Sequence, residues 1–169
     1  MTLIMTLPRN ELDQDMVDEI HFLYLMTTLP AYAGLFLTAF LAATVLPMQS
    51  EAVLVGMVLA DYPPVLLVAV ATVGNVLGSV VNWAIGRQVE RFRGKRWFPA
   101  SPAQVERATA WYRRYGRWSL LLSWVPVIGD PLTVVAGALR EPLVSFVAIV
   151  AVAKCARYVV LAAAPMAFG

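Results

Sequence analysis

The stretch TVLPMQSE, residues 44–51, interrupts an otherwise apolar run that extends from residue 31 to residue 60. Proline lacks a backbone donor and clashes with the preceding helical turn, so Pro47 is expected to break a helix. An ionised carboxylate in hydrocarbon is costly unless it is paired or faces water, so Glu51 needs a partner. The stretch therefore predicts a helix that is broken inside a membrane, with an acid directly after the break.

The same pattern returns 79 residues later as SWVPVIGD, residues 123–130. Each copy has a hydroxyl residue, a proline three positions on, and a small residue followed by an acid, which is Asp130 in the second copy. Two broken helices, each with an acid just past the break, are typical of a membrane transport site. Structural roles in the two hairpins are assigned to Pro47, Ser50, Pro126 and Gly129.

The composition is that of an integral membrane protein. Of its 169 residues 60% are hydrophobic and 14% charged, and the mean hydropathy is +0.69; globular domains carry about 25% charged residues. We expect an acidic lead-in at residues 1–30 and a membrane domain at residues 31–169. The lead-in includes a helix over residues 20–29 that either lies on the membrane or enters it, and Pro30 ends or kinks this helix. The single Cys155 excludes a disulfide within the chain. The lone His21 speaks against a metal site, and no cofactor is expected.

Charge is distributed unevenly along the chain. Residues 87–117 hold nine of the thirteen basic residues and two acids. Because membrane segments flank this loop, the positive-inside rule explains it better than nucleic-acid binding, and it predicts a cytoplasmic loop. Pro102 and Gly116 predict the ends of a helix within it. Trp111 and Tyr112, among arginines, suggest that this helix lies against anionic headgroups, although a plain topology signal is the simpler reading.

Two spans and two broken segments account for the apolar residues. Residues 65–86 and 143–165 are long enough to cross a membrane. Residues 31–60 form either one long tilted span or a re-entrant hairpin, and the half-length arms of residues 118–139 suit a re-entrant hairpin. The first span carries a polar stripe and a pair of glycines that would allow close helix packing, within one protomer or between protomers of a homo-oligomer. These residues are Asn75, Ser79, Asn82, Gly74 and Gly78.

The second span carries Lys154 and Arg157 three residues apart, on one face with Tyr158. Asn75 follows Glu51 by 24 residues, and Lys154 follows Asp130 by the same interval. If the basic loop is cytoplasmic, the hairpins enter from opposite sides. The predicted fold is therefore an all-α, polytopic membrane protein of two inverted repeats, each with a Pro-broken re-entrant hairpin and a transmembrane helix.

These residues resemble a known family. LPMQSEAVLV at residues 46–55, GNVLG at 74–78, and IGR at 85–87 are similar to the DedA superfamily, also called the VTT or SNARE-associated domain. RYG at 114–116, LLSWVPVIGD at 121–130 and KCARY at 154–158 resemble its YqaA-like branch. The resemblance implies a multi-pass protein of the bacterial inner membrane that transports lipid-linked phosphates as a flippase or scramblase, with proton coupling. It also implies a role for Glu51, the acid after the first hairpin proline.

One departure from the family pattern changes where the cations come from. Typical members carry an Arg-Phe-x-Pro-x-x-Arg-like motif in the second hairpin, whereas residues 123–130 contain no arginine and an additional acid. The positive charge for a phosphate headgroup would then come from Lys154 and Arg157, with Glu51 and Asp130 neutralising it in the empty state and Asn75 nearby.

Two other readings stay open. In the first, a pair such as Glu51–Lys154 or Asp130–Arg157 merely locks helices together, in a non-transporting scaffold or assembly factor. In the second, the chain is an intramembrane enzyme, which the lack of a Ser/His/Asp set in the sequence argues against. The expected partners are membrane lipids with anionic headgroups.

Overall fold

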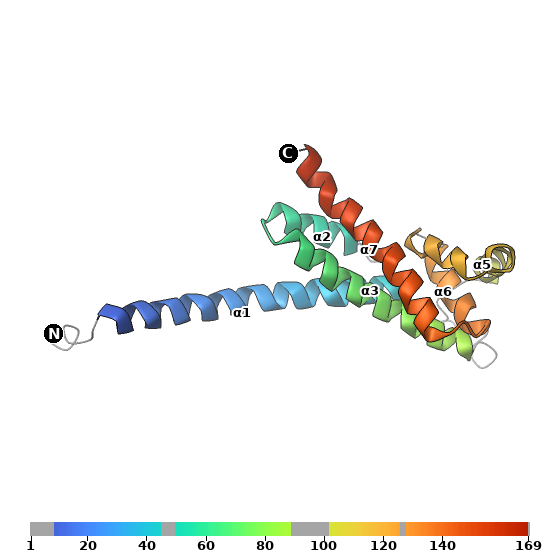
Figure 1. The fold of residues 1–169 in the computed structure, drawn as a ribbon, viewed down its shortest axis with the longest axis horizontal. Coiled ribbons are helices and arrows are strands. Elements are labelled where there is room, and N and C mark those ends of the chain that lie inside the picture. Colours follow the sequence, from blue (N-terminus) through green and yellow to red (C-terminus); the bar gives the residue numbers. More distant parts are fainter. Residues whose placement is uncertain (1–8, 45–49, 89–101, 126–127, 169) are drawn as a thin grey trace. The chain divides into compact units, whose positions relative to one another are not determined.

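All elements that the structure describes are helices (Figure 1), in agreement with the predicted all-α class. The structure is a computed structural model, and it describes residues 9–44, 50–88, 102–125 and 128–168. The elements are α1 (Arg9–Thr44), α2 (Ser50–Leu59), α3 (Pro64–Arg87), α5 (Pro102–Tyr115), the 3₁₀ helix η1 (Gly116–Trp124), α6 (Gly129–Ala138) and α7 (Leu143–Phe168). The chain forms two compact units, Met1–Gly34 and Leu35–Gly169, which are described separately.

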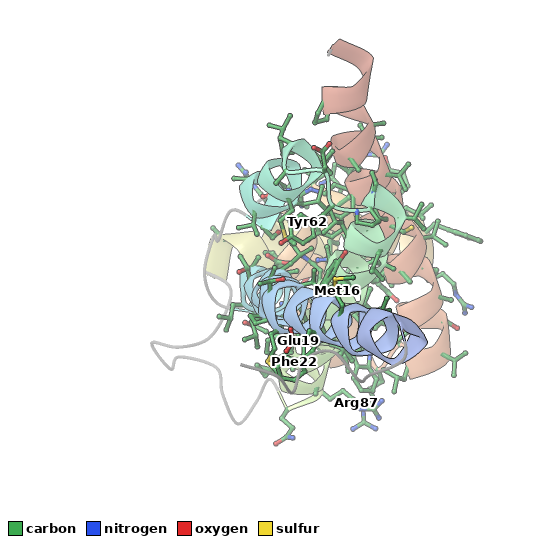
Figure 2. All side chains as sticks on the ribbon, turned by 90° about the vertical axis from the view of Figure 1, so that its left-hand side faces the viewer. Met16, Glu19, Phe22, Tyr62 and Arg87 are labelled. Carbon is green, nitrogen blue, oxygen red and sulfur yellow. The ribbon has the colours of Figure 1, made fainter. Side chains whose placement is uncertain are left out.

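The first unit consists of the N-terminal part of α1. Pro30 lies inside this helix, so of the two outcomes predicted at Pro30, the structure rules out a helix end. Several apolar side chains of this unit are more than half exposed, among them Met16 at 56% and Phe22 at 58%; Figure 2 labels both. Exposed apolar side chains of this kind are typical of surfaces that contact lipid or another protein.

Within the part of the chain that the structure describes, two helices are long and apolar enough to cross a membrane, and both were predicted. They are Pro64–Arg87, which is α3, and Leu143–Pro165 within α7. The 24 residues of α3 correspond to about 36 Å at 1.5 Å per residue, against a hydrocarbon core of about 30 Å. The helix in the basic loop was also predicted correctly: α5 begins at Pro102 and is followed by Gly116 with a φ of +60°.

The described helices end and begin on either side of the two predicted breaks. Helix α1 ends at Thr44 and α2 begins at Ser50, while η1 ends at Trp124 and α6 begins at Gly129. Pro47 and Pro126 themselves lie outside the described residues. Helices α2 and α6 have ten residues each, or about 15 Å. The nine residues of η1 reach about 18 Å, so none of these three helices is long enough to cross a membrane.

Both ten-residue helices end in the same turn, 79 positions apart. The second residue after each helix adopts a left-handed conformation, with φ of 61° at Asp61 and 59° at Arg140. Its N–H donates to the carbonyl three positions back, and the next N–H donates to the carbonyl five positions back, as in a Schellman motif. The bonds are Asp61 to Val58 (3.1 Å) and Tyr62 to Met57 (3.1 Å) after α2, and Arg140 to Gly137 (3.0 Å) and Glu141 to Ala136 (2.9 Å) after α6.

Glycines bring the helices of the second unit close together. A Cβ atom on Gly86 would overlap the carbonyl group of Val134 in α6, and one on Gly137 would overlap the carbonyl group of Trp83 in α3. Gly74 and Gly78 lie in the same way against Phe36 and Phe40 of α1. These two glycines therefore pack within the protomer. Beside the α3–α6 contact lies the apolar core, which includes Leu120, Leu132, Phe146 and Val150.

Replacing Gly137 by alanine tests the α3–α6 contact. We expect Gly137→Ala to lower the free energy of unfolding by about 1–3 kcal/mol, because the new methyl group overlaps the backbone of α3. Thermal unfolding in detergent measures the change.

Gly56→Ala is the matched control, because a Cβ atom at Gly56 meets nothing within 4 Å. It is expected to be neutral or to stabilise the helix by up to about 1 kcal/mol. Equal melting temperatures for Gly137→Ala and the wild-type protein would contradict the described packing.

Candidate functional site

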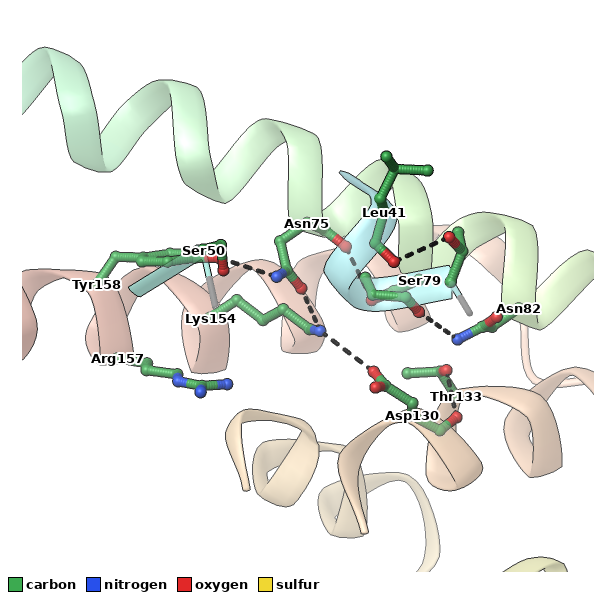
Figure 3. A network of polar contacts seen from close by, with 12 residues as sticks. Leu41, Ser50, Asn75, Ser79, Asn82, Asp130, Thr133, Lys154, Arg157 and Tyr158 are labelled. Atoms are coloured by element: carbon green, nitrogen blue, oxygen red, sulfur yellow. Dashed lines mark hydrogen bonds and ion pairs between the residues drawn. The ribbon is translucent and has the colours of Figure 1, made fainter. Parts of the chain in front are cut away.

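Polar side chains from α2, α3, α6 and α7 meet inside the second unit (Figure 3). Lys154 of α7 has a side chain only 4% exposed, and its Nζ lies 3.7 Å from Oδ1 of Asp130. Arg157, one turn further along α7, forms an ion pair with Glu51 through its Nη2. Together with Asn75 these are all five residues predicted for the site, and we refer to them with Ser50 and Tyr158 as the polar cluster.

The ion pairs join different residues from those named for the structural-lock alternative. Glu51 pairs with Arg157 rather than with Lys154, and Asp130 pairs with Lys154 rather than with Arg157. The reason is the position of α7, which crosses both short helices: Lys154 lies beside the start of α6 and Arg157 beside the start of α2. The sequence correctly predicted that the two acids lie near the two cations, but it assigned each acid to the wrong cation.

Both acids lie in the first turn of a helix, Glu51 in α2 and Asp130 in α6. The first N–H groups of a helix have no partner within it, and the helix dipole favours negative charge there. Each carboxylate is therefore stabilised from one side by a helix start and from the other by a cation. The site is built of two similar halves, one per broken segment.

Asn75 and Tyr158 connect these halves. Lys154 donates a hydrogen bond to Oδ1 of Asn75, and Nδ2 of Asn75 donates to the hydroxyl oxygen of Tyr158 at 2.9 Å. The same hydroxyl lies 3.0 Å from Oγ of Ser50. Sequence reasoning gave Tyr158 no role. The signal that could have found it is its spacing, four residues after Lys154 on the same helical face.

The remaining residues of the predicted polar stripe do not face the acids. Ser79 donates to the backbone carbonyl of Asn75 in its own helix, at 3.0 Å. Asn82 donates to the carbonyl of Ala43 at 2.6 Å and so connects α3 to the end of α1. Of the predicted stripe, Asn75 therefore belongs to the polar cluster, whereas Asn82 joins two helices.

Gly129 allows the start of α6 to pack closely against η1. A Cβ atom there would overlap the carbonyl group of Ser123. The absence of a side chain at Gly129 therefore lets the start of α6 lie against the backbone of η1, and Asp130 is the next residue. Among the described residues, no group of three or more His, Cys, Asp and Glu side chains is placed to hold a metal ion.

A second polar group lies outside the cluster, around the turn between α6 and α7. The hydroxyl of Tyr112 donates to Oε2 of Glu141 at 2.5 Å, and Nε of Arg117 lies 3.6 Å from Oε1 of the same residue. Trp83 donates to the carbonyl of Glu141 at 3.0 Å. Burial and the hydrogen bond to Glu141 raise the pKa of the Tyr112 phenol above its ordinary value, so the phenol stays protonated further into the alkaline range.

This contact corrects the prediction for the basic helix. Tyr112 was expected to lie against lipid headgroups with Trp111, but it is only 9% exposed and belongs to the protein core. Trp111 is exposed and stacks with Tyr115. Adjacent residues on a helix do not face the same way, so one of the two had to point inward.

Comparison with known proteins agrees with this architecture. The sequence profile of the VTT domain matches residues 20–164. The chain belongs to the VTT-domain family. No solved structure matches this VTT-domain chain.

Relatives of this VTT-domain protein come from several bacteria. It is 43% identical to the inner membrane protein YqaA of Escherichia coli over 132 residues, covering 78% of this chain and 88% of that protein. It is 37% identical over 139 residues to an uncharacterized protein of Haemophilus influenzae, covering 75% and 82%. A weaker match, 28% over 91 residues, joins 49% of this chain to 45% of undecaprenyl phosphate transporter A of Staphylococcus aureus. The chain is therefore an inner-membrane protein, in agreement with its two apolar spans.

Tyr112→Phe tests the attachment of α5. We expect it to lower stability by about 1–3 kcal/mol, because it removes a buried hydrogen bond to Glu141. The local effect is faster tryptic cleavage within α5, which contains Arg107, Arg113 and Arg114.

Tyr115→Phe serves as the control. Tyr115 is 46% exposed, so loss of its hydroxyl group is expected to leave the cleavage rate unchanged. Equal cleavage rates for the two variants would show that Glu141 does not hold α5.

The Lys154–Asp130 pair is tested by removing one charge and then both. Asp130→Ala leaves a buried ammonium without an acid, which costs about 3–5 kcal/mol. Adding Lys154→Met removes the orphaned charge, so the double variant should recover more than half of that loss in thermal unfolding.

Glu106→Ala is a control for removing an acid, because Glu106 is exposed on α5 and should change stability by less than about 0.5 kcal/mol. A double variant no more stable than Asp130→Ala would contradict a buried ion pair.

Proposed function

We propose that this VTT-domain protein moves anionic, phosphate-bearing lipids between the leaflets of the inner membrane, as a flippase or scramblase that contributes to envelope homeostasis. The observation that carries the proposal is the polar cluster: two cations lie between two short helices, and each is held by an acid at a helix start. Charges inside a membrane domain are expensive and mark ion or substrate pathways.

Several features support an arrangement of two inverted repeats with re-entrant hairpins. The short helices reach only part of the way across a bilayer, and the turns after α2 and α6 match bond for bond at an interval of 79 residues. Asn75 and Lys154, which occupy equivalent positions in the two repeats, contact each other. Equivalent residues meet in this way when they lie close to a pseudo-twofold axis. The proposed topology places the hairpins on opposite sides of the membrane and residues 87–117 in the cytoplasm.

Binding follows from the chemistry of the cluster. A phosphate headgroup competes with Glu51 for Arg157 and with Asp130 for Lys154, and the helix dipoles at the starts of α2 and α6 favour its negative charge. An acid that has lost its cation becomes easier to protonate. Uptake and release of a proton at Glu51 or Asp130 would then accompany movement of the lipid, which is the form of proton coupling proposed here.

The name of one relative is consistent with this substrate class. Undecaprenyl phosphate transporter A is by its name a transporter of a lipid phosphate, and its matching region covers about half of each chain. YqaA is named as an inner membrane protein and the Staphylococcus aureus relative as a transporter. We therefore propose transport without covalent catalysis.

A non-transporting scaffold is the second candidate, and one observation favours it. Both cations of the cluster already have protein partners, and the buried Lys154 has two, Asp130 and Asn75. A cluster of saturated pairs can lock helices together without binding anything else. The two candidates differ in what happens to a properly folded variant that has lost one charge.

Transport in proteoliposomes separates these candidates. Labelled phospholipids and a labelled polyprenyl phosphate would be followed from leaflet to leaflet for wild type, Glu51→Gln, Asp130→Asn and Lys154→Gln, with melting curves recorded for each. We expect wild type to move at least one anionic lipid and the folded variants to be slowed at least about tenfold, the effect of losing one charge-assisted hydrogen bond. Unchanged transport in variants that melt normally would exclude the cluster as the transport site. No transport by wild type, with lower melting temperatures in the variants, would support the scaffold.

A further inference from the structure

The orientation of the Asn75 amide is fixed by its neighbours. A lysine ammonium is a donor with no acceptor, so the oxygen of Asn75 must face Lys154. The amide nitrogen then faces Tyr158 and donates to its hydroxyl oxygen at 2.9 Å. If the Lys154 ammonium moves away from Asn75, the amide is therefore no longer held in this orientation.

The hydroxyl group of Tyr158 carries the connection further, to α2. Because its oxygen accepts the proton of Asn75, its own hydrogen is available to Oγ of Ser50, 3.0 Å away. Ser50 is fully buried and Tyr158 is 1% exposed, so water does not substitute for either partner. Ser50 immediately precedes Glu51, which pairs with Arg157. A continuous series of polar contacts thus runs from Asp130 through Lys154, Asn75 and Tyr158 to Ser50, as Figure 3 shows.

We propose that Tyr158 is a positioning residue that couples the two ion pairs of the polar cluster, so that a headgroup bound at one half alters the other. This inference rests on the proposed function, because it assigns a role within the same site. An anion that draws Lys154 away releases the amide of Asn75, and through Tyr158 it releases Ser50 at the start of α2. The Glu51–Arg157 pair then loses the support of its neighbour, and both halves of the site become available to one headgroup.

The coupling depends on the hydroxyl group of Tyr158 and not on its ring. Phenylalanine at this position would fill the same volume in the core and would leave both ion pairs with their partners. It would remove only the oxygen that Asn75 and Ser50 share. Tyr158→Phe therefore distinguishes a coupling role from a packing role.

Asparagine-selective nitrogen labelling gives a test that needs no transport. The chain contains three asparagines, Asn10, Asn75 and Asn82, so the side-chain amide signals in detergent can be assigned with single substitutions. We expect Ser50→Ala to move the Asn75 signal in the wild-type background and to leave it in place in the Tyr158→Phe background. The Asn82 signal is the internal control, since its amide donates to Ala43 and not to the cluster.

The outcomes separate the inference from the proposed function. Loss of the native Asn82 signal would reveal that Tyr158→Phe fails to fold. In that case Ser50→Ala in the wild-type background still tests the coupling, because an Asn75 signal that does not move overturns it. A shift of equal size in both backgrounds also overturns it. In proteoliposomes we expect Tyr158→Phe to lower the transport rate about tenfold, with Tyr115→Phe unchanged. Coupled amide signals in a wild-type protein that moves no labelled lipid would instead overturn the proposed function and leave the coupling in place.

Discussion

The structure depends on one constraint, which is that a cation inside a membrane domain must have a partner. Lys154 and Arg157 lie within the second span, and the two short helices bring an acid to each of them. The acids reach these cations because α2 and α6 start inside the protein, where Ser50 and Gly129 are buried. The starts of the two short helices thus supply the acids that reduce the free-energy cost of burying the two cations.

Close backbone packing makes this arrangement rigid. Gly86 and Gly137 let α3 and α6 approach until the backbone of one contacts the other, and Gly129 lets α6 start directly behind η1. The Tyr112–Glu141 contact secures the far end of α6 to the basic helix. Asp130 therefore lies on a short helix that packs against its neighbours at both ends.

Local signals in the sequence predicted where several helices begin and end. The two Pro-containing stretches marked the breaks, and Pro102 and Gly116 marked the ends of α5, because proline and glycine act through their own backbone geometry. The ion-pair partners and the role of Tyr158 were not predictable in the same way, since the partners of Tyr158 lie 83 and 108 residues away and depend on how α7 is rotated. The 3₁₀ form of η1 and the burial of Tyr112 likewise result from tertiary packing, which outweighs local preference.

The most direct test of the central claim is whether an anionic headgroup reaches Lys154. The chain has two lysines, Lys95 and Lys154, so lysine-selective labelling gives two ammonium signals that one substitution assigns. Titration with decyl phosphate, a lipid-like phosphate that disperses in detergent, should move the Lys154 signal saturably and leave the Lys95 signal unchanged. A Lys154 signal that stays in place while the protein remains folded, or one that moves no more than Lys95, would contradict the claim that the polar cluster binds a lipid phosphate.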